Sequence, residues 1–143
     1  MRRERGFTYL FVLFFVAITA AAMAALGQAW STASQRERES ELEFRGGEIA
    51  RAIWSYRNAG LGQQLPASFD DLIEDRRTWP YRHHLRRAYA DPFTGKANWV
   101  LIAEPTQSGR FRGVRSSSEH ALLRQTTHDG QKVIKASDWI FGN

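Results

Sequence analysis

The sequence predicts an α+β fold in which a long N-terminal helix carries a small antiparallel sheet packed on its C-terminal half. Three patterns lead to this prediction: a long uncharged apolar run, an apolar stripe with helical spacing, and short strand-like segments towards the C-terminus. We expect a short basic leader, a transmembrane half-helix, an amphipathic half-helix and a small α+β head, at residues 1–6, 7–30, 31–60 and 61–143.

The apolar run covers residues 6–30 and contains 25 positions without a charged side chain. About 20 apolar residues are enough for one helix to cross the hydrocarbon layer of a membrane. Arg2, Arg3 and Arg5 precede the run, and positive residues beside a span favour the cytoplasmic side. We therefore expect a single-pass membrane protein with its N-terminus in the cytoplasm and its head outside it.

The helix is expected to continue beyond the apolar run, from about Phe7 to about Arg57, since no proline occurs before Pro66. Apolar residues at spacings of seven, four and three keep to one face of its second half; they are Leu42, Ile49, Ile53 and Tyr56. Each glycine costs a helix roughly 1 kcal/mol relative to alanine, so Gly46-Gly47 predict a local bend or melted turn.

Turn and cap signals follow the long helix. Residues 58–62 place glycines where a helix ends. Ser68, with an acid three residues later, has the pattern of a helix N-cap and predicts a short helix through Asp75. We expect another turn or two of helix within 81–89, and turn chemistry in Asp91-Pro92-Phe93-Thr94-Gly95.

The remaining segments are expected to be extended. Residues 99–103 form a strong strand pattern, and residues 111–116 alternate apolar with basic side chains. Residues 132–135 and 139–141 predict a third strand or two short ones. Short strands after one helix suggest an antiparallel sheet laid on the amphipathic half of that helix.

Composition limits the classes of function. The chain has 143 residues, a formal charge of +5 and no cysteine, so thiolate metal sites and a cysteine nucleophile are excluded. Part of the positive charge belongs to the leader, where it indicates orientation more than an acidic ligand. About 113 residues remain beyond residue 30, enough for one small domain.

The junction Gly6-Phe7-Thr8-Tyr9-Leu10 resembles the cleavage site of type IV pilins and type II secretion pseudopilins. Two later segments, 65–72 (LPASFDDL) and 89–96 (YADPFTGK) followed by Trp99, resemble major pseudopilins. The resemblance implies the pilin-like fold and cleavage between Gly6 and Phe7 by a prepilin peptidase, with N-methylation of Phe7.

The same resemblance implies a structural subunit of a type II secretion system or a related type IV pilus-like machine. Such a subunit is held in the inner (cytoplasmic) membrane with a periplasmic head. Its expected partners are other pilin-like subunits, the prepilin peptidase and the inner-membrane assembly platform.

Three features depart from that family. Phe11 stands where the family usually has a glutamate, which is thought to pair with the free amine of a neighbouring subunit. The proline found midway along the family's first helix is missing, so the associated kink is not expected. Asp129 and Asp138 are too few and too scattered for the calcium site of major pseudopilins, and no metal is expected.

The apolar half of the helix offers candidates for packing between subunits. Small residues four positions apart allow close helix approach, and they occur here as a ridge of Ala17, Ala21, Ala25 and Ala29. Phe11 joins these candidates because it replaces the usual charged contact. The charged stretch 36–45 is either a solvated face or a set of ion pairs between subunits.

Other functions are less well supported. The basic and aromatic segment 76–87 has residues that suit nucleic acid, but a head outside the cytoplasm rarely meets it, so we do not expect nucleic acid as a partner. His83 and His84 are adjacent and point apart, which argues against a shared metal. Ser116–Ser118, His120 and Asp129 lack a nucleophile elbow, so we expect no enzyme and no cofactor.

Two alternatives to a filament subunit stay open. The chain could be a secreted soluble binding domain, cut by a conventional signal peptidase within the alanine-rich segment 20–24. It could also be an uncut single-pass anchor for an extracytoplasmic binding domain with no filament role.

Overall fold

The computed structural model describes residues 5–142, and for Arg5 and Gly6 it describes the backbone alone. The leader residues Met1–Glu4, including the orienting Arg2 and Arg3, lie outside the described residues. The described chain divides into two compact units, one up to Glu37 and one from Arg38 onward. The second unit contains the head together with the last 22 of the 55 residues of the long helix.

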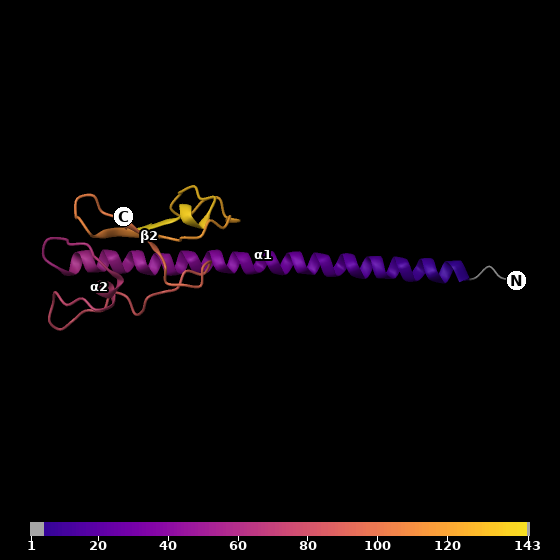
Figure 1. The fold of residues 1–143 in the computed structure, drawn as a ribbon, viewed down its shortest axis with the longest axis horizontal. Coiled ribbons are helices and arrows are strands. Elements are labelled where there is room, and N and C mark those ends of the chain that lie inside the picture. Colours follow the sequence, from indigo (N-terminus) through magenta and orange to yellow (C-terminus); the bar gives the residue numbers. More distant parts are fainter. Residues whose placement is uncertain (1–4, 143) are drawn as a thin grey trace. The chain divides into compact units, whose positions relative to one another are not determined.

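Helix α1 runs from Arg5 to Ala59 without interruption and confirms the predicted long helix. Figure 1 shows it as a single coil in indigo and magenta. Helical geometry continues through Gly46 and Gly47, so the melted turn allowed for at these glycines does not occur. It also continues past Gln28, in keeping with the absence of a proline there.

The sheet has three antiparallel strands in the order β1-β2-β3, with β1 at Val100–Ala103, β2 at Phe111–Arg115 and β3 at Ile140–Gly142. Leu101 is opposite Val114, and Val114 is opposite Phe141, so these three side chains share one face of the sheet. Within the second unit, β2 lies alongside the late, magenta part of α1 in Figure 1.

The core lies between this sheet and the amphipathic part of α1, as the apolar stripe predicts. Leu42, Ile49, Ile53 and Tyr56 are each at most 4% exposed, which confirms the predicted buried face. The other half of the core comes from the head: Leu65, Leu72, Leu85, Trp99, Phe111, Val114, Val133, Trp139 and Phe141.

Gly46 has a positive role in this packing. A Cβ atom at this position would lie 2.4 Å from Cγ and Cδ2 of Phe141, much closer than a real Cβ contact allows. A Cβ atom at Gly47 would have no neighbour within 4 Å. The sequence suggested a weak point in the helix here, whereas the structure shows that Gly46 lets β3 approach the helix backbone.

Helix α2 (Phe69–Ile73) begins with the predicted capping box at Ser68. It ends two residues earlier than expected, because Glu74 adopts an extended conformation and the chain turns back through a bridge between Asp75 and Arg82. No helix forms between Tyr81 and Tyr89, so that prediction is wrong.

The C-terminal region also differs in part from the prediction. The segment around Lys132–Lys135 makes two isolated bridges, to Thr126 and Ala121, in place of a strand. A 3-10 helix, η1 (Ala136–Asp138), separates it from β3. One short strand therefore forms where one or two were expected.

Candidate assembly helix and the contacts that hold the head

The apolar half of α1 is uncovered in this chain. All described side chains from Phe7 to Ala33 are exposed, and Phe7 itself is 78% exposed. The helix is long enough and apolar enough to cross a membrane. Exposing so large an apolar surface to water is unfavourable, because each Å² of apolar surface costs roughly 25 cal/mol of free energy.

Polar side chains within this half satisfy their hydrogen bonds locally. The Thr19 hydroxyl lies 3.0 Å from the Phe15 carbonyl oxygen and 2.9 Å from that of Val16, so it can donate to either. The Thr32 hydroxyl donates to the Gln28 carbonyl at 3.0 Å. A hydroxyl bonded to its own helix can enter a membrane without leaving an unpaired donor.

The predicted processing site and packing candidates all lie on this helix. Gly6 and Phe7 are in its first turns, since α1 begins at Arg5. Phe11, Ala17, Ala21 and Ala25 are exposed along it, and Ala29 continues their four-residue spacing. Within the unit that ends at Glu37 these side chains form an exposed apolar surface of the kind that a membrane or a second protein covers.

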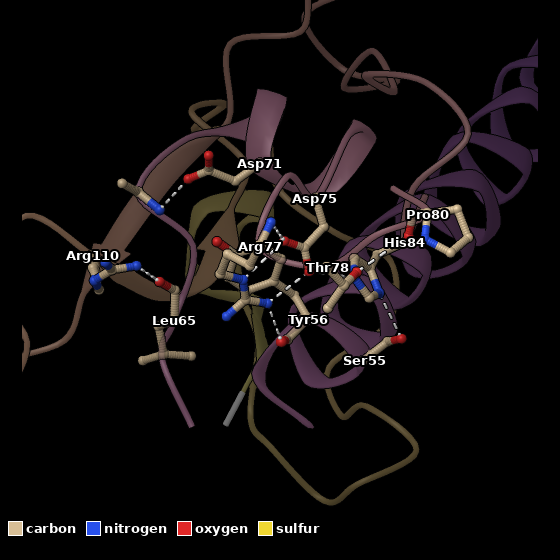
Figure 2. Close-up of polar contacts among 11 residues, drawn as sticks. Ser55, Tyr56, Leu65, Asp71, Asp75, Arg77, Thr78, Pro80, His84 and Arg110 are labelled. Carbon is tan, nitrogen blue, oxygen red and sulfur yellow. Dashed lines mark hydrogen bonds and ion pairs between the residues drawn. The ribbon is translucent and has the colours of Figure 1, made fainter. Parts of the chain in front are cut away.

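The head is tied to the helix by a buried polar network, shown in Figure 2. The Arg77 guanidinium donates from Nε to Asp75 Oδ1 at 2.9 Å and from Nη2 to Asp75 Oδ2 at 2.8 Å. The same Nη2 donates to the Tyr56 carbonyl oxygen at 2.7 Å, near the end of α1. The guanidinium carbon also lies 3.5 Å from the centre of the Tyr56 ring, a cation–π contact.

The charges of Asp75 and Arg77 balance each other in this network, with the carboxylate buried and the guanidinium partly exposed. The Asp75 side chain is fully buried, and hydrogen bonds from Arg77 hold the pKa of its carboxyl well below the usual range. Asp75 in turn raises the pKa of Arg77. Gly60 leaves room for the guanidinium, because a Cβ there would lie 2.7 Å from Arg77 Nη1.

His84 extends the network to a second point on the helix. Its Nδ1 lies 2.8 Å from the Ser55 hydroxyl, and its Nε2 lies 3.2 Å from Asp75 Oδ2. The neighbouring His83 ring is exposed and contacts the Ile73 carbonyl, so the two histidines separate as expected. Sequence reasoning missed the network because its members are distributed over residues 55–84, and only their burial reveals them.

Part of the charged stretch 36–45 serves the chain's own fold. Glu39 is buried, and its carboxylate accepts the backbone N–H groups of Leu123 and Arg124. The Arg124 side chain then pairs with Glu43 at 2.7 Å. The sequence did not predict this buried role of Glu39, whereas the exposed residues 36–38, 40 and 41 agree with the solvated face that it offered as one interpretation.

The predicted Asp-Pro turn is confirmed and fixed to the sheet. The Asp91 carboxylate accepts the Ser116 hydroxyl at 2.6 Å and the Phe93 N–H at 2.9 Å. Both Asp91 and Ser116 are fully buried, and Ser116 directly follows β2. Ser116 therefore has a structural partner.

The basic and aromatic segment 76–87 divides into buried and exposed parts. Arg77 and His84 belong to the network, while Trp79 is 84% exposed and its ring meets that of Tyr81 edge-on at 5.2 Å. Within residues 5–142, no three His, Asp or Glu side chains come together as a group that could hold a metal ion.

Comparison of this chain with protein-family models, with curated proteins and with solved structures found no match. Its function is therefore argued from its own residues.

Proposed function

We propose that this chain is a pseudopilin-like structural subunit of a type II secretion system or a related type IV pilus-like machine. In this proposal a prepilin peptidase cuts between Gly6 and Phe7. The mature helix is then held in the inner membrane until it assembles with other pilin-like subunits on the assembly platform. The three arginines of the leader favour a cytoplasmic N-terminus and a periplasmic head.

One observation carries the proposal: a single 55-residue helix is bare along its apolar first part and buried under an α+β head along its last part. A conventional signal peptide would be removed within the apolar run, and the continuous helix into the head would serve no purpose. A helix retained after cleavage can serve first as a membrane anchor and then as a packing element between subunits.

The position of Phe11 favours a minor or atypical subunit. A glutamate at this site would have to find a partner in the membrane, since an unpaired carboxylate there is costly. Phe11 avoids that cost and gives up the ionic contact. Assembly would then depend on apolar packing along the ridge of Ala17, Ala21 and Ala25.

The buried network supports a structural role for the polar residues of the head. Ser55, His84 and Asp75 are in hydrogen-bonding sequence, but the His84 side chain is 4% exposed and Asp75 is bound on two oxygens by Arg77. These three side chains are therefore already engaged in contacts that hold the head on the helix. We therefore infer a non-enzymatic protein.

N-terminal sequencing and intact mass of the membrane-extracted protein test the proposal. A chain beginning at methylated Phe7 supports it, a start within residues 20–25 indicates a secreted domain, and an intact Met1 indicates an uncut anchor. Gly6→Val should block cleavage, whereas Gly27→Val is the matched control, because a Cβ at Gly27 meets nothing within 4 Å. Equal processing of both variants would reject the assigned site.

A further inference from the structure

The sheet ends in two different free edges. Its order is β1-β2-β3, so β1 and β3 each have one hydrogen-bonded neighbour among the described residues. The outer side of an edge strand presents backbone N–H and C=O groups that can pair with another chain. Adding a strand to such an edge is a common way for proteins to recognise extended segments.

A groove of about 360 Å³ borders the edge at β3. Helix α1 contributes Gly47, Ala50 and Trp54 to its lining, which also includes residues 127–129. Trp54 is 63% exposed although it is a large apolar side chain. Large exposed aromatic residues beside a groove are typical anchors of protein interfaces.

The opposite edge of the sheet carries an exposed apolar side chain of its own. Leu101 of β1 is 43% exposed although it shares the face of the buried Val114 and Phe141. Glu104, which follows β1, accepts the Thr106 hydroxyl at 2.7 Å and lies near Arg112 and Arg57 of its own chain. The two edges are therefore matched by apolar side chains, Leu101 at one and Trp54 at the other.

The strand directions determine how two copies can meet. Since β1 and β3 are both antiparallel to β2, they run parallel to each other. Two copies anchored in one membrane through the same helix have the same orientation. Only pairing of β1 in one copy with β3 in the other keeps both copies in that orientation and joins the same face of both sheets. A β3–β3 or β1–β1 pair requires one copy to be inverted or its sheet turned over.

We propose that β1 of one copy adds as a parallel strand to β3 of a neighbouring copy. Leu101 shares the face of Val114 and Phe141, so in the neighbour it points towards the groove at Ala50 and Trp54. The contact rests on the proposed function, because assembly brings equally oriented copies together.

The absence of cysteine makes disulfide trapping a clean test. Two full-length chains with different tags, one Leu101→Cys and the other Ala50→Cys, are co-expressed in membranes and oxidised. We expect a mixed disulfide dimer at least fivefold more abundant than the homodimer of either variant. Lys96→Cys paired with Ala50→Cys is the control and should give none, because Lys96 lies in the exposed turn that precedes β1. Unchanged tryptophan fluorescence of each variant shows that the head remains folded.

Two results would overturn the inference. The first is a homodimer of Leu101→Cys or Ala50→Cys as abundant as the mixed dimer, which would indicate a symmetric contact. The second is no mixed dimer at all. A parallel oxidation of Ala25→Cys distinguishes failure of the strand contact from failure of the proposed function. Ala25→Cys dimers without a Leu101→Cys/Ala50→Cys dimer would reject the contact between β1 and β3 alone. The absence of both dimers would reject assembly through the helix as well.

Discussion

The two adjacent glycines of α1 allow the contact between helix and sheet to be measured directly. Replacing either one by alanine removes the same helix penalty, roughly 1 kcal/mol. Gly47→Ala should therefore raise the free energy of unfolding by up to about 1 kcal/mol. Gly46→Ala gains the same amount, but its methyl group would lie 2.4 Å from the Phe141 ring.

Forcing an extra methyl group into a packed core usually costs about 1–3 kcal/mol. Gly46→Ala should therefore be less stable than Gly47→Ala by about that amount, and close to the unchanged protein or up to about 2 kcal/mol below it. For a head of this size, each 1 kcal/mol corresponds to a change in Tm of about 4 °C or more.

Urea unfolding of the full chain in detergent, followed by tryptophan fluorescence, provides the assay. Trp139 is a suitable reporter because it is buried and stacks on Phe141 with ring centres 5.2 Å apart. Adding Phe141→Leu to Gly46→Ala should recover part of the loss attributable to the clash. If Gly46→Ala were as stable as Gly47→Ala, the close approach of β3 to the helix would be wrong.

Three further predictions concern the buried network and the apolar helix. Asp75→Asn leaves the Arg77 charge without its carboxylate and should lower the free energy of unfolding by about 3–5 kcal/mol in urea titrations, while the exposed Asp70→Asn should change it by less than about 0.5 kcal/mol. The pKa of the Asp75 carboxyl is lowered in the folded head, so its contribution to the free energy of unfolding is present above the unfolded pKa near 4 and is lost as the pH falls towards the folded pKa. The free energy of unfolding of Asp75→Asn should therefore depend less on pH between pH 5 and pH 2. An unchanged pH profile would contradict this. Ala21→Leu should reduce the yield of disulfide-trapped Ala25→Cys helix dimers severalfold, while the amount of protein extracted from the membrane stays the same. Met23→Leu, on another side of the helix, should not reduce that yield. Equal dimer yields in the two variants would exclude the alanine ridge as a contact face.

The elements that the sequence predicted well depend on local signals. The stripe from Leu42 to Tyr56 has helical spacing and becomes the buried face. The cap at Ser68 forms because its partner lies three residues away. The turn at Asp91 likewise uses local chemistry, although its tie to Ser116 does not appear in the local pattern.

The incorrect predictions concern segments whose structure depends on distant partners. Residues 81–89 have no helix because Arg82 pairs with Asp75 and the backbone N–H of Leu85 donates to the Leu72 carbonyl at 2.8 Å. The buried role of Glu39 depends on backbone groups more than 80 positions away. Composition identifies such residues as charged or apolar but cannot say which distant groups will meet them.

The two unlike edges of the sheet have a consequence for how an assembly would stop growing. The proposed contact between β1 and β3 is directional, so under that proposal every copy has one donor edge and one acceptor edge. A copy with an intact β3 and a blocked β1 would then bind at one end of the assembly and offer no edge for the next copy. If the proposed filament forms, small amounts of such a copy would stop its growth and the sheet would set its length.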